Sequence, residues 1–167
     1  LHDIPNTVER AVANVARLGV DLLTVHAYPQ TLEAAAAGRG ASPLRLLGVT
    51  VLTSMTPADA TEAGYGGTIA ELVAARTAAA KASGVDWVVC SPAEAAAARA
   101  ILGAAGLVVT PGVRPAGAAG DDQARIATPA AAILAGASHL VVGRPITRAS
   151  DPKAAAEAIL AEIARVA

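Results

Sequence analysis

The sequence predicts a parallel α/β fold in one domain that spans residues 1–167. Short β-branched runs alternate with longer Ala-rich stretches of helical period, which is the pattern of repeated strand–helix units. The strand-like runs are apolar on both faces, as buried parallel strands are. The chain is long enough for one sizeable core, and no linker, charge block or low-complexity tract divides it.

Five stretches have the composition of buried strands. They are rich in Val, Leu and Ile and lack the polar alternation of a half-exposed strand. The chain has no Phe, one Trp and two Tyr, so its core must be built from aliphatic side chains. The predicted strands are residues 21–27, 44–54, 86–91, 106–113 and 138–147.

Six stretches between and around these strands have helical period and, in several cases, a start signal. Ser91 precedes Pro92, and Glu94 follows three residues after the serine, as in a capping box. Thr128 before Pro129 repeats the N-cap and proline arrangement. The predicted helices are residues 5–18, 29–37, 67–83, 92–103, 128–136 and 151–166.

Polar side chains at the strand ends favour a (β/α)8 barrel over an open doubly wound sheet. His26, Thr53, Ser54, Arg114 and Arg144 lie where strands are predicted to end, and barrel active sites are built at those ends. No G-x-G-x-x-G follows the first strand, which removes the main support for a dinucleotide-binding sheet. Five strands cannot close an eight-stranded barrel, so we expect a barrel that is N-terminally incomplete.

Composition argues against several classes of protein. A net charge of −1 gives no support for binding to nucleic acid or to a membrane surface. The apolar runs are far shorter than a membrane span, and no secretory signal is visible. The single Cys90 is expected in the core of a cytoplasmic protein. The three histidines, His2, His26 and His139, lack the spacing of metal ligands, so no metal is expected.

Two adjacent loops have the composition of a phosphate site. Gly143 and Arg144 follow the last predicted strand, where glycine allows close approach of a backbone N–H and arginine offers a planar fork. The preceding strand leads to Arg114, Gln123 and a Gly-rich stretch, 114–123, which we interpret as a long mobile loop that could close over an anion. A solvated surface pair remains the alternative for Gly143 and Arg144.

Other polar residues allow both a functional and a structural interpretation. Thr53 and Ser54 could bond a polar ring or satisfy backbone groups of their own loop. His26 could equally be a hydrogen-bonded histidine of the core or rim. Asp3 stands just before Pro5, where it could cap the first helix.

Taken together, six motifs resemble the bacterial form of the orotidine 5′-phosphate decarboxylase family. They are "LHDIPNT", "GVDLLTVHA", "VTVLTSM", "VDWVVCS", "VTPGVRP…GDDQ" and "VVGRPIT…DP", in the family's order and spacing. The resemblance implies a (β/α)8 barrel and a homodimer with shared active sites. It also implies decarboxylation of orotidine 5′-phosphate to uridine 5′-phosphate in pyrimidine synthesis, without metal or organic cofactor.

The resemblance also assigns roles to individual residues. The family's motif D-x-K-x-x-D-I-P-N-T would place its first Asp and its catalytic Lys upstream of Leu1, with Asp3 as the second, catalytic Asp. That Lys would protonate the C6 carbanion. Thr7 would contact the ribose, and Thr53 the pyrimidine. The implied substrate-binding residues are Ile4, Pro5, Asn6, Thr7, Thr53, Arg114, Gln123, Gly143 and Arg144, of which the last four hold the phosphate.

Two alternatives remain open at the level of sequence. One is a metal-dependent sugar-phosphate decarboxylase or aldolase of the same superfamily, and the other is an inactive barrel fragment that only folds or dimerises. Lys81 and Lys153 are both predicted in helices and cannot replace the catalytic Lys. We therefore expect these residues to be the C-terminal portion of a longer polypeptide.

Overall fold

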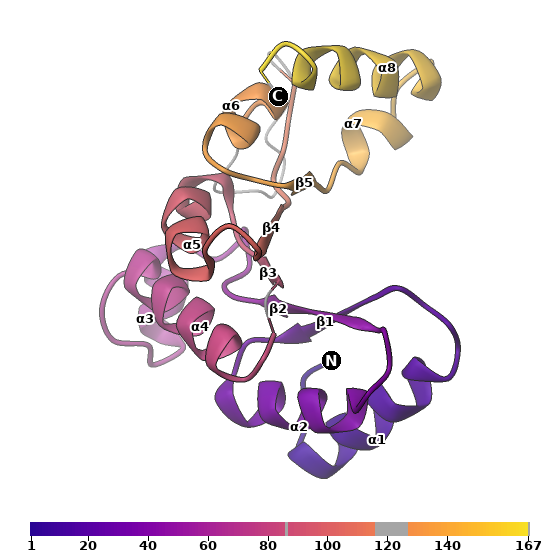
Figure 1. Ribbon diagram of the computed structural model, residues 1–167. Coiled ribbons are helices and arrows are strands. Elements are labelled where there is room, and N and C mark those ends of the chain that lie inside the picture. Colours follow the sequence, from indigo (N-terminus) through magenta and orange to yellow (C-terminus); the bar gives the residue numbers. More distant parts are fainter. Residues whose placement is uncertain (86, 116–126, 167) are drawn as a thin grey trace.

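The computed structural model describes residues 1–85, 87–115 and 127–166 and contains a parallel five-stranded sheet (Figure 1). The strands follow one another across the sheet in chain order, and each pair is parallel. This confirms the predicted α/β class and all five strand positions. The strands are β1 (Leu22–His26), β2 (Arg45–Val49), β3 (Trp87–Val89), β4 (Leu107–Thr110) and β5 (His139–Leu140).

The helices between the strands lie on one side of the sheet, so the chain forms a crescent with an open inner face (Figure 1). Six of these elements match predicted helices, with ends that differ by a few residues. They are α1 (Pro5–Ala16), α2 (Pro29–Arg39), α4 (Ile69–Ala82), η1 with α5 (Pro92–Glu94, Ala95–Leu102), α6 (Pro129–Leu134) and α8 (Pro152–Ile163). None of the described helices is both long and apolar enough to cross a membrane.

Two short helices were not predicted. Helix α3 (Pro57–Glu62) starts at a full capping box, in which Thr56 and Asp59 bond each other's backbone N–H groups. Helix α7 (Arg144–Thr147) occupies the end of the predicted strand 138–147, which is therefore wrong beyond Leu140. Pro145 explains the change, because proline fits the first turn of a helix and cannot donate to a strand ladder.

The predicted strand 44–54 is also too long. Strand β2 ends at Val49, and the next residues form a loop that leads to α3. Thr50 still binds the neighbouring strand, because its N–H and its Oγ1 both donate to the Val89 carbonyl, at 3.0 and 2.8 Å. Val51, which follows Thr50, still belongs to the main core, whereas Leu52 is exposed. The residues that follow, including Thr53, are therefore placed in a loop at the end of the sheet.

The main core lies between the sheet and helices α1, α2, α4 and α5. Its strand residues point toward the helices and are almost inaccessible, as Val25, Leu46, Val88 and Val108 show. Cys90 belongs to this core, which confirms its predicted burial. A second, smaller cluster joins β5 and α6, with Val113, Ala132 and Ala137 as its buried members and Leu140 and Val142 packed against it.

Helices α1 and α2 approach each other very closely at Gly38. A Cβ atom at this position would lie 2.2 Å from the carbonyl oxygen of Glu9, which is far inside contact distance. Only glycine fits without moving the backbone of α1. This contact sets the position of α1, and with it the segment of residues 1–4 that enters the helix.

Candidate functional site

The carboxyl ends of the five parallel strands lie at one edge of the sheet. Residues predicted for the site follow these ends in order: His26 ends β1, Thr53 follows β2, Arg114 follows β4, and Gly143 and Arg144 follow β5. Because neighbouring parallel strands end side by side, the topology collects these residues along one rim.

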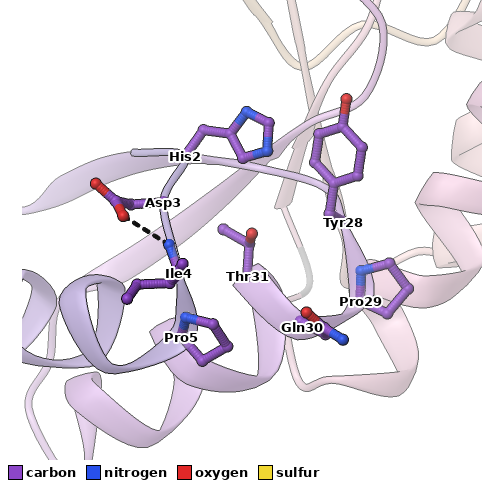
Figure 2. A pocket seen from close by; sticks show the side chains of 8 residues that line it. All are labelled: His2, Asp3, Ile4, Pro5, Tyr28, Pro29, Gln30 and Thr31. Atoms are coloured by element: carbon purple, nitrogen blue, oxygen red, sulfur yellow. Dashed lines mark hydrogen bonds between the residues drawn. The ribbon is translucent and has the colours of Figure 1, made fainter.

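The segment before α1 adds Asp3 to this rim. The amino group of Leu1 donates to the Thr24 carbonyl at 2.8 Å, and the His26 N–H donates to the Leu1 carbonyl at 2.9 Å. Leu1 therefore lies alongside β1 like a further parallel strand, and Asp3 follows where that pairing stops. The Asp3 side chain accepts a hydrogen bond from the next N–H, that of Ile4, at 2.7 Å (Figure 2).

The helix-capping alternative for Asp3 is wrong. The N-cap of α1 is Ile4, and no side chain caps this helix end, although Pro5 does occupy its first turn as predicted. The carboxylate is exposed and engages only the adjacent backbone N–H among the described residues. It remains accessible to a ligand or to a second chain.

A cavity of about 690 Å³ opens beside Asp3 (Figure 2). One wall comes from the segment that precedes α1 and the other from the start of α2. Asn6 and Thr7 lie in the exposed first turn of α1 and do not line this cavity. The lining residues are His2, Asp3, Ile4, Pro5, Tyr28, Pro29, Gln30 and Thr31.

His2 is part of a column of stacked side chains at this rim. Its ring stacks on Tyr28, with centroids 4.5 Å apart and planes 10° from parallel, and His26 lies 5.2 Å away. The Arg76 guanidinium lies 4.4 Å from the Tyr28 ring centroid and 5.0 Å from that of Tyr65. The two phenol oxygens are hydrogen-bonded at 2.5 Å.

The titratable groups in and beside this column have shifted pKa values. Burial lowers the pKa of His26, and the positive charges of His2 and Arg76 lower it further. Burial raises the pKa of Tyr28, whereas the hydrogen bond between the two hydroxyls lowers the pKa of Tyr65. A neutral His26 is therefore favoured near neutral pH, beside a hydrogen-bonded phenol pair whose rings contact Arg76.

The loop after β2 is attached to the same column. The Arg76 side chain is only 8% exposed, and its Nη1 donates to the Thr50 carbonyl. Three residues further on, Thr53 is buried, whereas Ser54 is exposed. Thr53 therefore lies in a loop that is tied both to β3, through Thr50, and to α4, through Arg76.

The end of the rim that is predicted to bind phosphate is built differently. Arg114 is only 6% exposed, and its Nη1 donates to the carbonyl of Val113 at 2.9 Å. Its Nε is buried with no hydrogen-bond partner among the described residues. Gly143 is the N-cap of α7, and Arg144 is the first, half-buried residue of that helix. Buried donors of this kind fit an anionic ligand.

Strands β4 and β5 bring these two arginine-bearing loops together. The Val141 N–H donates to the Thr110 carbonyl at 3.0 Å, so the carboxyl ends of β4 and β5 lie next to each other. Gln123 lies outside the described residues, as does most of the predicted mobile loop 114–123. The predicted neighbourhood of Arg114 and Arg144 therefore has structural support, and the predicted lid remains an expectation.

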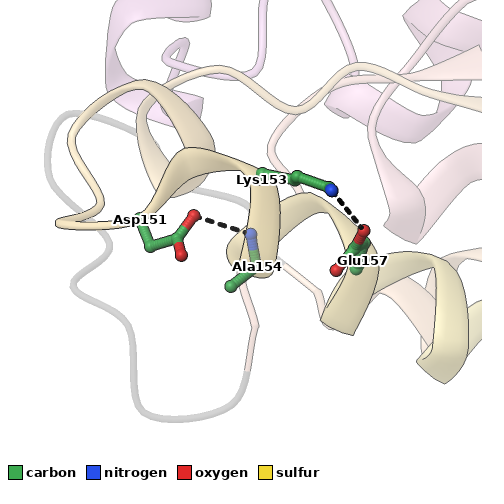
Figure 3. Close-up of polar contacts among 4 residues, drawn as sticks. All are labelled: Asp151, Lys153, Ala154 and Glu157. Atoms are coloured by element: carbon green, nitrogen blue, oxygen red, sulfur yellow. Dashed lines mark hydrogen bonds and ion pairs between the residues drawn. The ribbon is translucent and has the colours of Figure 1, made fainter.

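Both lysines of the sequence lie away from the Asp3 cavity. The Lys81 Nζ, in the last turn of α4, donates to the Ile101 carbonyl of α5 at 2.7 Å. Lys153 forms a pair with Glu157 along α8, at 3.8 Å, next to the capping contact of Asp151 with the Ala154 N–H (Figure 3). As predicted, both lysines belong to helices, and neither can supply an ammonium beside Asp3.

Sequence reasoning missed Tyr28, Tyr65 and Arg76. These residues are far apart in the chain, and none belongs to a recognisable motif. One weak signal existed: the sequence has only two tyrosines, and Tyr28 directly follows a predicted strand end, where functional side chains gather.

Comparisons with known proteins agree with this architecture. A model of the orotidine 5′-phosphate decarboxylase / HUMPS family matches residues 1–159. A protein named orotidine 5′-phosphate decarboxylase from Methylobacterium sp. (strain 4-46) is 64% identical over 98% of this chain and 71% of its own length. Another of that name, from Rhodopseudomonas palustris (strain HaA2), is 60% identical over 99% of this chain and 70% of its own length.

Solved structures extend the match to three dimensions. The crystal structure of orotidine 5′-phosphate decarboxylase from Lactobacillus acidophilus has a TM-score of 0.80 and 42% identity, over 98% of this chain and 72% of the other. This similarity confirms the barrel class, of which the five strands here form a part. By sequence and by fold, the chain belongs to the orotidine 5′-phosphate decarboxylase / HUMPS family.

Proposed function

We propose that the protein to which these residues belong decarboxylates orotidine 5′-phosphate to uridine 5′-phosphate in de novo pyrimidine biosynthesis. One observation carries the proposal. A carboxylate, Asp3, and two arginines, Arg114 and Arg144, follow strands that end at one rim of a barrel whose relatives are named for this reaction. The substrate needs both kinds of group, because its reacting carbon and its phosphate lie at opposite ends.

The chemistry requires charge stabilisation at C6 of the pyrimidine. When the C6–carboxylate bond breaks, its electron pair stays on C6 and CO2 leaves, and a proton must then reach C6. The family motif supplies that proton from a Lys that would immediately precede Leu1. Asp3, reaching in from the second protomer of a dimer, would hold the ammonium of this Lys in place, which pre-organises the charge for the transition state.

The remaining residues would bind the parts of the substrate that do not react. Arg114, whose Nε is buried with no hydrogen-bond partner among the described residues, would serve a phosphate oxygen, and Gly143 and Arg144 follow the neighbouring strand. We assign Gln123 to the same phosphate. Binding energy gained there can be used at the distant reacting carbon.

Thr53 would hydrogen-bond the pyrimidine, and Thr7 the ribose. Ile4, Pro5 and Asn6 would shape the segment that carries these contacts. We further propose a cytoplasmic homodimer in which Asp3 and Thr7 reach the partner's site. The exposure of the Asp3 carboxylate and the 66% exposure of Ile4 support this arrangement.

The test compares two polypeptides. One consists of residues 1–167. The other, called the extended polypeptide below, carries the family's D-x-K segment ahead of Leu1 within a complete barrel. We expect the extended polypeptide to consume orotidine 5′-phosphate, followed by its absorbance, in the presence of a metal chelator, and the 167-residue chain to show no turnover. Turnover by the shorter chain would contradict the assignment of the proton donor.

Variants of the extended polypeptide test the roles of individual residues. Asp3→Ala should reduce kcat much more than it weakens binding of uridine 5′-phosphate, because Asp3 acts at the reacting carbon. Asp21→Ala is the matched control, since Asp21 is an exposed aspartate at the opposite end of β1. Turnover of a sugar phosphate that depends on Mg²⁺ would favour the metal-dependent superfamily members instead.

A further inference from the structure

The column of His2, Tyr28, Arg76 and Tyr65 links two parts of the rim that are far apart in sequence. At one end, His2 is the residue directly before Asp3, and its ring stacks on Tyr28. At the other end, Arg76 donates to the carbonyl of Thr50, in the loop that carries Thr53. The column therefore joins the Asp3 segment to the Thr53 loop.

The column has the features of a rigid support. Arg76 is buried, and it is not part of an ion pair among the described residues. Its charge is instead compensated by the Thr50 carbonyl and by the faces of two phenol rings. A hydrogen bond between the Tyr28 and Tyr65 hydroxyls joins the two rings that contact Arg76. Each member restricts its neighbours, so a shift of Tyr28 would be transmitted to His2.

The surroundings of Tyr28 fix the position of its backbone. The Tyr28 N–H donates to the His26 carbonyl, and Pro29 starts α2 immediately afterwards. The backbone at Tyr28 is thus fixed between the end of β1 and the first turn of a helix. Its ring forms one wall of the Asp3 cavity, beside His2 (Figure 2).

We propose that Tyr28 and Arg76 are positioning residues for the reaction, which hold His2, and through it the catalytic motif, at a fixed place relative to the Thr53 loop. The inference rests on the proposed function. Neither residue touches the reacting atoms: Tyr28 acts through His2, and Arg76 acts through Tyr28 and Thr50. Misplacement of a catalytic group by about 1 Å can cost about 100-fold in rate, so a support of this kind has a measurable effect.

The first arm of the test uses nuclear magnetic resonance on the 167-residue chain and needs no activity. The Tyr28 ring should shift the His2 ring protons upfield. Tyr28→Phe should preserve that shift, because it keeps the ring, and Tyr28→Leu should abolish it and also move the Thr53 amide signal. His2 and Thr53 signals that are unchanged in Tyr28→Leu would overturn the inference, whatever the activity.

The second arm measures kcat and KM of the extended polypeptide. Tyr28→Leu and Arg76→Met should lower kcat by about 10- to 100-fold with a much smaller change in KM, while Tyr28→Phe retains most of the activity. Arg17→Met, at an exposed arginine beyond α1, is the matched control. Circular dichroism and thermal unfolding identify variants that fail to fold.

The outcomes separate the two proposals. No turnover by the unaltered extended polypeptide contradicts the proposed function, and the resonance measurements still decide whether Tyr28 couples His2 to the Thr53 loop. Turnover that Tyr28→Leu and Arg76→Met leave unchanged, in folded protein, overturns the inference and leaves the proposed function intact.

Discussion

The two hydrophobic clusters of this chain differ in how completely they are covered. The larger cluster packs β1–β4 against α1, α2, α4 and α5, and most of its members are inaccessible. The smaller cluster, at β5 and α6, has three buried members, and Leu134 and Leu160 nearby are 70% and 64% exposed. Each supports one end of the rim: the larger carries the Asp3 segment and the Thr53 loop, and the smaller carries the arginine loops.

The two ends of the rim therefore differ in how their geometry is fixed. The end that would place reacting groups rests on a dense core and on a stacked column, so its geometry is fixed before a ligand arrives. The end that would bind phosphate rests on fewer contacts and offers buried donors, such as the Arg114 Nε, that a ligand could satisfy. Four predictions test this contrast, in order of decreasing effect.

The largest effect is expected for truncation of Leu32, which is 0% exposed in the larger cluster. Leu32→Ala should lower the free energy of unfolding by about 2–5 kcal/mol, because it removes buried methyl groups and leaves a cavity. Leu134→Ala, in the exposed surroundings of the smaller cluster, should change it by less than about 0.5 kcal/mol. Urea denaturation of the 167-residue chain measures both, and equal losses would contradict the contrast.

Arg144→Ala tests the phosphate end. In the extended polypeptide it should weaken binding of uridine 5′-phosphate by about 1.5–3 kcal/mol, the range for a charged hydrogen bond, and binding of uridine only slightly. Calorimetric titration with the two ligands gives the difference. Arg165→Ala removes the same charge from an exposed site on the C-terminal segment and serves as the control. Equal losses for nucleotide and nucleoside would remove Arg144 from the phosphate site.

Gly38→Ala tests the close contact that places α1. The added Cβ would collide with the Glu9 carbonyl, and overpacking of this kind costs about 1–3 kcal/mol. For a chain of this size, that corresponds to a lower Tm by roughly 2–4 °C per kcal/mol. Gly66→Ala is the control, because a Cβ there meets nothing within 4 Å. If both variants melt at the same temperature, the contact at Gly38 is not as tight as described.

The smallest effect concerns the titration of His26. Its pKa is lowered in the folded chain, so this state binds fewer protons than the unfolded chain does. The contribution of His26 to stability is therefore complete above about pH 6.5, the ordinary value for histidine, and declines as the pH falls from there to the folded pKa. Resonance titration of the His26 ring should give a midpoint below about 6.5, and a higher midpoint would contradict its burial beside positive charges.

Much of the fold follows from local signals in the sequence. Helix starts are marked by a capping residue before proline, as at Thr128, whose Oγ1 accepts from the Ala131 N–H, and at Asp151. The same signal at Thr56 preceded α3, although a helix this short leaves no periodic pattern to support it. The strand after Ser138 was overestimated, because an apolar run does not show where Pro145 turns the chain into a helix.

The site was less predictable than the fold. Asp3, Arg114 and Arg144 belong to recognisable sequence motifs, and the topology places all three along one rim. Their roles remain predictions. Tyr28 and Arg76 meet only because α2, which begins after Tyr28, packs against α4, and no local pattern encodes that contact. Tertiary proximity between distant residues is the information that a single sequence lacks.

The burial of Cys90 has a practical consequence. It is the sole cysteine of the chain and follows β3, where its N–H donates to the Val109 carbonyl at 3.2 Å in the middle of the sheet. A thiol reagent can reach it only when β3 and β4 separate or the helices over them lift away. The rate of labelling therefore reports how often the sheet opens, and its change when uridine 5′-phosphate is added would measure how strongly the rim and the sheet beneath it are coupled.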